Sequence, residues 1–224
     1  MKPGRVSGLF VFFGQVIPTG ISRRIALIGE RIALGGWYKT NFRQVVALVP
    51  NRFDLLKLGC DRLKGNFTYL EFGVSSGDSM RFMKNVTIGI HDIELHGYDT
   101  FTGLPDSHHD KVMTGSFSQE GATPEISGVI WHKGLFSDTF SGHELFLSGK
   151  LFLMFDADLY SSTKYVLGKV LNSVKPGDLM YFDDLHIPNQ ERLALTEFIG
   201  LGLSLELVAR SIEGRSALFE VIGK

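Results

Sequence analysis

Two short apolar runs in the chain end in closely spaced aspartates. The run LFLMF is followed by Asp156 and Asp158, and the run LMYF by Asp183 and Asp184. Each run is too short for a typical helix and is bounded by turn residues, as buried strands are. Because neighbouring parallel strands end at one edge of a sheet, we expect these carboxylates to lie close together. So many negative charges need a cation, a shared proton or a cationic ligand.

A glycine loop earlier in the chain predicts a ligand site at the same edge. The segment Phe67–Phe72 (FTYLEF) is typical of a strand, Gly73 and Gly77 follow it, and a helix is expected from Met80. The glycines let the backbone turn tightly and approach a ligand, and the helix presents its positive N-terminus. The spacing Gly-x-x-x-Gly lacks the middle glycine of the dinucleotide fingerprint, which argues against NAD. Structural turn glycines are the alternative explanation.

Two carboxylates beside this loop indicate which kind of nucleoside it binds. Glu71 precedes the loop, where a carboxylate would repel phosphate and attract an ammonium or sulfonium group. Asp99 ends the next expected strand, IELHGYD, and fits an acid that holds ribose hydroxyls. S-adenosylmethionine has a ribose and cationic groups but no phosphate. The pattern therefore favours S-adenosylmethionine as the cofactor.

The alternation of strand-like and helix-like segments predicts the fold. From residue 64 to residue 224 the order is typical of an α/β domain with a Rossmann-like, mostly parallel, seven-stranded sheet. Leu205–Arg210 and Ala217–Ile222, joined by a glycine turn, are expected to close the sheet as an antiparallel hairpin.

Residues 1–63 are expected to form a separate helical segment. Ile21–Leu63 has the apolar spacing of helices, with breaks at Gly35-Gly36 and Pro50, and its basic residues are expected to form a solvated face. The segment is interpreted as a lid, part of the acceptor pocket, a docking arm or an oligomer contact. A membrane span is not expected, because the apolar run Leu9–Val16 is too short to cross a bilayer. A signal peptide is the less favoured alternative, because Pro18-Thr19-Gly20 follows the run in place of a small-residue cleavage site.

Composition narrows the class of protein. The chain has 224 residues and a formal net charge of −1, which gives no support for nucleic acid as the main partner. Cys60 is the only cysteine, so an intrachain disulfide and a cysteine metal cluster are excluded. We expect a cytoplasmic protein without a membrane span. A homo-oligomer is possible, with the N-terminal segment forming the contact between copies.

Six motifs, in this order along the chain, resemble those of the macrocin O-methyltransferase family. They are EFGVSSG (Glu71–Gly77), YDTFTGLP (Tyr98–Pro105), GSFS (Gly115–Ser118), GLFSDT (Gly134–Thr139), DADLYSST (Asp156–Thr163) and the pair Asp183-Asp184. Members of this family are class I S-adenosylmethionine-dependent enzymes that methylate sugar hydroxyls on natural products. The resemblance implies the class I methyltransferase fold and an O-methyltransferase activity.

The resemblance also implies roles for individual residues. It implies a Mg²⁺ ion bound by Asp156, Asp183 and Asp184, and a general base at Asp158. The residues implied to contact the cofactor are Glu71, Gly73, Gly77, Ser79 and Asp99, with Ser137 near the adenine. The chain departs from the family where an aromatic residue usually follows the aspartate pair, because Leu185-His186 stands there. His186 is therefore a second candidate for the base or for an acceptor contact.

The expected chemistry explains why these residue types are needed. A hydroxyl is a poor methyl acceptor at neutral pH because its proton is hard to remove. A hard cation would lower the pKa of the hydroxyl, and Asp158, one step further out than Asp156, would accept the proton. Two alternatives stay open: Asp158 as the N-cap of the next helix, and Asp183-Asp184 as a turn or capping pair without a metal.

The hypothesis from sequence is an S-adenosylmethionine-dependent, Mg²⁺-assisted O-methyltransferase. Its acceptor is a hydroxyl of a small molecule, with a sugar or a glycosylated natural product expected. The alternatives are an NAD-type Rossmann oxidoreductase and a non-catalytic binding protein that retains the methyltransferase fold.

Overall fold

The chain forms two compact units, residues 1–43 and residues 44–224. The computed structural model describes residues 3–42, 46–90, 93–106, 113–142 and 149–224. The division lies before the boundary at residue 63 that the sequence suggests. The reason is that β1 (Ala47–Val49) pairs with a strand of the main sheet and α3 (Arg52–Leu63) packs against that sheet, so both belong to the second unit.

The first unit consists of two helices, α1 (Pro3–Val16) and α2 (Thr19–Asn41). The expected break at Gly35-Gly36 is wrong, because α2 continues through both glycines and ends at Asn41. Each of the two adjacent glycines lowers helix stability by about 1 kcal/mol but leaves the backbone free to stay helical. At the end of α2 the ring of Trp37 packs edge-on against Tyr38 and Phe42, with ring centroids 5.0 and 5.4 Å away.

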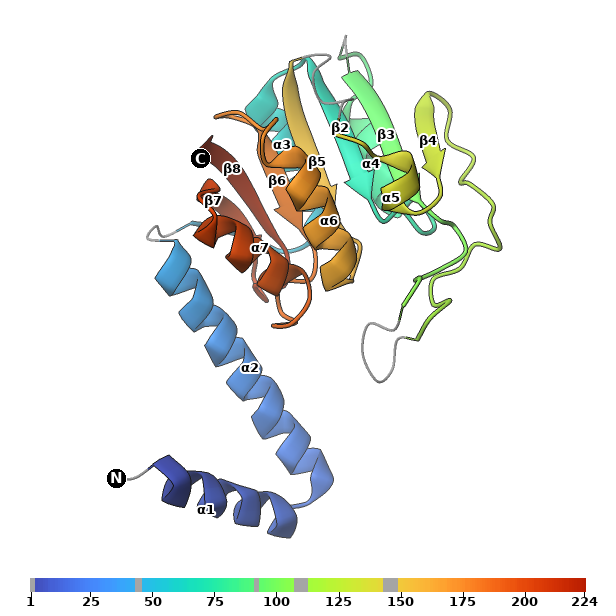
Figure 1. Cartoon of the computed structure of the whole chain (residues 1–224). Coiled ribbons are helices and arrows are strands. Elements are labelled where there is room, and N and C mark those ends of the chain that lie inside the picture. The colour runs from blue at the N-terminus through green and yellow to red at the C-terminus, as the bar shows by residue number, and fades with distance from the viewer. Residues whose placement is uncertain (1–2, 43–45, 91–92, 107–112, 143–148) are drawn as a thin grey trace. The chain divides into compact units, whose positions relative to one another are not determined.

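The second unit is built on one eight-stranded sheet (Figure 1). The strand order is β1-β7-β8-β6-β5-β2-β3-β4, and every pair is parallel except those of β8 with β6 and β7. The predicted mostly parallel α/β sheet with a C-terminal antiparallel hairpin is confirmed, with β1 as an additional strand that the sequence did not reveal. The remaining strands are β2 (Phe67–Phe72), β3 (Ile93–Asp99), β4 (Val129–Lys133), β5 (Lys150–Phe155), β6 (Leu179–Phe182), β7 (Ser204–Ser211) and β8 (Ala217–Gly223).

Helices cover both faces of the sheet. Figure 1 shows α5, α6 and α7 on one face and α3 and α4 on the other. On the second face, Leu55 and Leu56 of α3 and Met83 of α4 are buried with Tyr69 and Phe152 of the central strands. With both faces covered, β2 is buried along its whole length, which is why its sequence is almost continuously apolar. The bounds of the other helices are α4 (Asp78–Val86), α5 (Phe136–Thr139), α6 (Tyr160–Val170) and α7 (Glu191–Gly200).

The register of the central strands places the predicted site residues at one level. Phe72 pairs with Tyr98 and with Phe155, and Phe155 pairs with Phe182. The next residue on each of these four strands is therefore Gly73, Asp99, Asp156 or Asp183. The sequence-based expectation that the acidic strand ends meet at one edge of the sheet is confirmed.

Gly73 is required at this edge for a steric reason. Its φ is 95°, and an added Cβ would overlap the backbone carbonyl oxygen of Asp156 on the neighbouring strand. A side chain here would both strain the backbone and push the ends of β2 and β5 apart.

We predict that Gly73→Ala lowers the free energy of unfolding by about 3 kcal/mol or more, from overlap plus strain. Gly200→Ala, at the end of α7 where an added Cβ meets nothing within 4 Å, is the matched control and should change stability by less than about 1 kcal/mol. Urea unfolding followed by circular dichroism measures both. Equal stability of the two variants would contradict the steric account.

Candidate functional site

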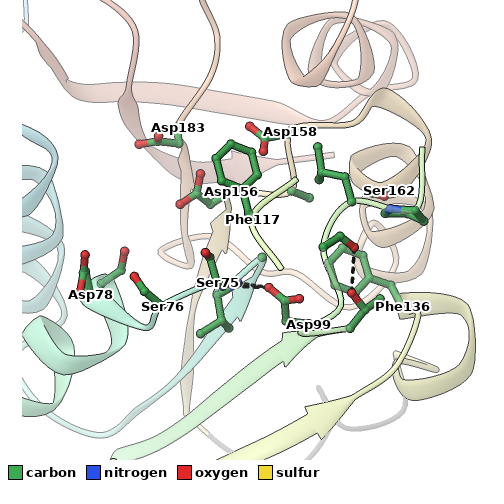
Figure 2. Close-up of a pocket in the computed structure, with 18 of the residues that line it drawn as sticks. Ser75, Ser76, Asp78, Asp99, Phe117, Phe136, Asp156, Asp158, Ser162 and Asp183 are labelled. Carbon is green, nitrogen blue, oxygen red and sulfur yellow. Dashed lines mark hydrogen bonds between the residues drawn. The ribbon is translucent and has the colours of Figure 1, made fainter. Parts of the chain in front are cut away.

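A cavity of about 300 Å³ opens at the carboxyl edge of β2, β3, β5 and β6 (Figure 2). Its walls come from the glycine loop after β2, the loop after β3, the start of α5 and the acidic loop after β5. Ligands bind to parallel α/β sheets at this edge. The predicted site residues that line the cavity are Gly73, Ser79, Asp99, Asp156, Asp158 and Asp183.

Asp99 organises the glycine loop. One carboxylate oxygen accepts hydrogen bonds from the backbone N–H groups of Val74 and Ser75, at 2.7 and 2.9 Å (Figure 2). The other oxygen accepts one from the backbone N–H of Phe101, at 2.7 Å. Ser75 and Phe101 both have positive φ, so these bonds stabilise a backbone that L-residues rarely adopt. Asp99 therefore shapes the cavity as well as lining it.

Glu71 lies below the cavity and not in its wall. Its side chain is fully buried, and one oxygen accepts a hydrogen bond from the Tyr69 hydroxyl at 3.0 Å. Burial first, and then the charge of Asp156, raise the pKa of Glu71 well above its ordinary value. Burial therefore disfavours the charged carboxylate, which weakens the expected attraction of Glu71 for a sulfonium group.

Gly77 and Ser137 also lie outside the cavity wall. Gly77 precedes α4 with a φ of 83°, and an added Cβ would lie 2.9 Å from the ring of Pro124. This geometry fits the structural alternative for the second loop glycine. The exposed hydroxyl of Ser137 donates a hydrogen bond to Asp138, while Leu135 and Phe136 before it form an apolar part of the wall.

The acidic cluster is balanced by Arg52, the first residue of α3. One guanidinium nitrogen lies 2.6 Å from Asp156 and also donates to the hydroxyl of Ser79, and the other nitrogen lies 3.6 Å from Asp183. The side chain of Asn51 caps α3 by accepting hydrogen bonds from the backbone N–H groups of residues 53 and 54. This cap fixes the start of the helix and therefore the position of Arg52. The expectation that the basic residues here form a solvated face is wrong for Arg52.

A second arginine binds the other end of the cluster. The guanidinium of Arg215, in the turn between β7 and β8, lies 2.7 Å from Asp184 and 3.7 Å from Asp183. Asp183 also accepts hydrogen bonds from the hydroxyls of Tyr181 and Ser216. The carboxylates of Asp183 and Asp184 are almost completely buried, and burying them without a positively charged partner would be costly. Arg215 supplies positive charge to both.

Glu191, at the start of α7, joins the two acidic loops from behind. Its carboxyl oxygens accept hydrogen bonds from the backbone N–H groups of Ala157 and Asp184, at 3.2 and 3.1 Å. Burial raises its pKa well above the ordinary value, and the charges of Asp184 and Asp156 add to the effect. Glu191 thus holds both acidic loops in position, a role that no sequence motif indicates.

Asp158 points into the cavity from a strained position. Its φ is 61°, unusual for a residue other than glycine, and Figure 2 shows its carboxyl group near that of Asp156. Burial first, and then the charges of Asp156 and Asp184, raise the pKa of Asp158 to about 8. The alternative role as a helix N-cap is wrong, because α6 begins after Leu159 without a side-chain cap and the Tyr160 N–H is bound by Gln190.

His186 and Asp184 do not line the cavity. The imidazole Nδ1 of His186 lies 3.6 Å from Asp184, and the ring is partly exposed. The structure therefore places Asp158, and not His186, in the cavity wall.

The predicted magnesium ligands do not fit a metal ion in their present arrangement. Asp156, Asp183 and Asp184 supply the oxygen donors that Mg²⁺ prefers. However, Arg52 and Arg215 already hold these carboxylates. Within the ranges that the structure describes, no group of three or more histidine, cysteine, aspartate or glutamate side chains is arranged to hold a metal.

Comparison with solved structures identifies the same fold in O-methyltransferases. The calicheamicin methyltransferase CalS11 has 21% identity and a TM-score of 0.60, covering 75% of this chain and 76% of its own; it is also described as a TDP-rhamnose 3′-O-methyltransferase. The O-methyltransferase NovP has 20% identity and a TM-score of 0.58, covering 76% and 79%. A CmcI structure with Mg and SAM has 19% identity and a TM-score of 0.51, covering 75% and 70%.

No protein-family model and no curated protein sequence matches the chain. At these low identities the structural likeness shows the fold alone. The Rossmann-like methyltransferase fold is therefore established, and membership of the macrocin O-methyltransferase family stays a prediction.

We predict that Arg52→Gln raises the affinity of the cluster for Mn²⁺ by about tenfold or more, because it removes a positive charge that competes for Asp156 and Asp183. Titration followed by the electron paramagnetic resonance of free Mn²⁺ measures this. Arg62→Gln, on the same helix in a surface ion pair with Glu220, is the matched control and should leave the affinity unchanged. An unchanged affinity in Arg52→Gln would show that Arg52 does not compete with a metal.

Proposed function

We propose that this protein is an S-adenosylmethionine-dependent O-methyltransferase that acts on a hydroxyl group of a small molecule. The observation that carries the proposal is that Asp99, after β3, and Asp158, after β5, line the same cavity (Figure 2). The carboxylate of Asp99 could accept hydrogen bonds from ribose hydroxyls, and the carboxylate of Asp158 could accept the proton of an acceptor hydroxyl. The shared fold with O-methyltransferases supports the same reaction class.

The proposed cofactor half of the cavity lies between the glycine loop and α5. Asp99 would accept hydrogen bonds from the ribose hydroxyls, while Leu135 and Phe136 offer an apolar wall suited to the adenine ring. Gly73 lets the backbone of the loop come close to the ligand. The sulfonium of the bound cofactor supplies the methyl group.

The proposed acceptor half is the acidic end of the cavity. In its ionised form, which predominates above its pKa of about 8, Asp158 would accept the proton of the attacking hydroxyl as that oxygen bonds to the methyl carbon. Arg52 and Arg215 balance the charges of the neighbouring carboxylates, so a neutral acceptor can approach without facing an unpaired acidic cluster. A sugar is the proposed acceptor class, in line with the sugar substrate named for CalS11.

A magnesium ion remains a proposal that depends on displacing an arginine. The Mg and SAM complex of CmcI concerns that protein, whereas the carboxylates of this chain are held by guanidinium groups. If a Mg²⁺ ion binds, Asp156, Asp183 and Asp184 are the residues that would hold it, and it would polarise the acceptor oxygen. No step of the proposed reaction depends on this ion.

The two alternatives make different predictions. An NAD-type oxidoreductase is disfavoured because Ser75 stands at the middle position of the loop, where the dinucleotide fingerprint has glycine. A non-catalytic binding protein would bind S-adenosylmethionine without turnover. Binding and turnover are therefore tested separately.

We predict that the wild-type protein binds S-adenosylmethionine and S-adenosylhomocysteine in calorimetry. Asp99→Asn should weaken binding by roughly ten- to a hundredfold, because a charged acceptor for the ribose hydroxyls is lost. Asp61→Asn, an exposed aspartate paired with Lys57 on α3, is the control and should bind as the wild type does. Absence of binding of both ligands to the wild type would refute the proposed function.

We predict that Asp158→Asn lowers kcat by about a thousandfold while the affinity for S-adenosylhomocysteine stays unchanged, because the proton acceptor is removed without touching the cofactor half. Methyl transfer to a panel of hydroxylated small molecules, sugars included, is followed by the mass gained by the acceptor. A variant that turns over at the wild-type rate would exclude Asp158 as the base.

A further inference from the structure

The N-terminal helical unit differs sharply in charge from the rest of the chain. Residues 1–43 contain seven of the 23 basic residues and one of the 24 acidic residues, so they carry a formal charge of +6 against −7 for residues 44–224. The near-neutral total hides this separation. A basic segment of this kind is attracted to anionic surfaces.

One side of α2 is an exposed apolar stripe. Ile21, Ile25, Ile28 and Ile32 follow the i, i+4, i+7, i+11 spacing, so they lie along one line of the helix. Their side chains are between 49% and 70% exposed. Isolated exposed isoleucines are common, but a continuous row of four marks an interaction surface.

The helix before it is apolar as well. Phe10, Phe12, Phe13 and Val16 of α1 are each at least half exposed. The 14 residues of α1 reach about 21 Å, which is shorter than the hydrocarbon core of a bilayer. Among the described residues no helix is long and apolar enough to cross a membrane. These helices therefore suit a position in the plane of an interface.

Basic residues accompany the apolar stripe of α2. Arg23, Arg24 and Arg31 are exposed and lie off the line of isoleucines. A helix with an apolar stripe and an arginine-rich polar face is typical of segments that lie at the surface of anionic membranes. From the charge, the apolar stripe and the absence of a membrane-spanning helix among the described residues, we infer that α1 and α2 form an arm that binds the surface of an anionic lipid bilayer.

Charge favours a lipid surface over pairing of the arms of two copies. Two arms packed stripe against stripe would bring together two segments of +6 each. Anionic headgroups would instead neutralise the arginines while the isoleucines enter the acyl boundary. The inference rests on the arm alone and is independent of the proposed methyl transfer.

Vesicle flotation with the full chain tests this inference. The wild type should float with phosphatidylcholine vesicles that contain phosphatidylglycerol, and should not float with pure phosphatidylcholine vesicles. Replacing Arg23, Arg24 and Arg31 by Gln should weaken binding roughly a hundredfold, at about tenfold or less per charge. Ile25→Ser with Ile28→Ser should weaken it by about tenfold or more.

Ile88→Ser is the matched control, because Ile88 is 73% exposed but lies in the second unit, and it should bind vesicles as the wild type does. Failure of the wild type to float with anionic vesicles would overturn the inference, as would equal binding to neutral vesicles. Light scattering tests the alternative that the stripe binds a second copy of the chain. A wild type that forms a dimer and does not bind vesicles, together with loss of that dimer in the Ile25 and Ile28 variant, would support the alternative and refute binding to a lipid surface.

Discussion

The contact of Arg52 with Asp156 and Asp183 is the interaction on which the site depends. The aspartates follow β5 and β6 directly, so the register of the sheet forces their carboxylates together at a largely buried edge. Such a cluster is stable only with positive charge beside it. Arg52 supplies that charge from α3, which lies before the central strands in sequence, and thereby ties the helix to the acidic end of the cavity.

The other contacts of the site follow from this charge balance. Arg215 holds Asp184 from the β7–β8 turn, and Glu191 fixes the backbone of both acidic loops by accepting hydrogen bonds from Ala157 and Asp184. Asp158 is the residue that leans into the cavity, on a left-handed backbone that the surrounding contacts hold in place. The acidic residues therefore have different surroundings. The aspartates bound to arginine form a stable part of the cavity wall, and Asp158 faces the space where a ligand would bind.

The sequence predicted the parts of the fold that periodicity and turn residues encode. Apolar runs with acidic ends located β5 and β6, Asp99 marked the end of β3, and strand-type residues before a glycine loop located β2. Parallel register then placed Gly73, Asp99, Asp156 and Asp183 together. Sequence did not reveal β1, whose three residues are too few to show a pattern.

Side-chain direction was the part that could not be predicted. An arginine at the start of a helix looks the same in sequence whether it faces solvent or a buried acid, so Arg52 was assigned to a solvated face. Finding Arg215 required knowing that β8 pairs with β6, which brings the hairpin turn beside Asp184. Glu71 was expected at the ligand, but its strand position directs it into the core beside Tyr69.

The most direct test of the central claim is a crystal structure of the protein with S-adenosylhomocysteine. We expect the nucleoside in the cavity between the glycine loop and α5, with its ribose hydroxyls within hydrogen-bond distance of Asp99 and its sulfur directed toward Asp158. Arg52 should still contact Asp156. A ligand bound elsewhere, or a cavity that stays empty at saturating ligand, would contradict the account.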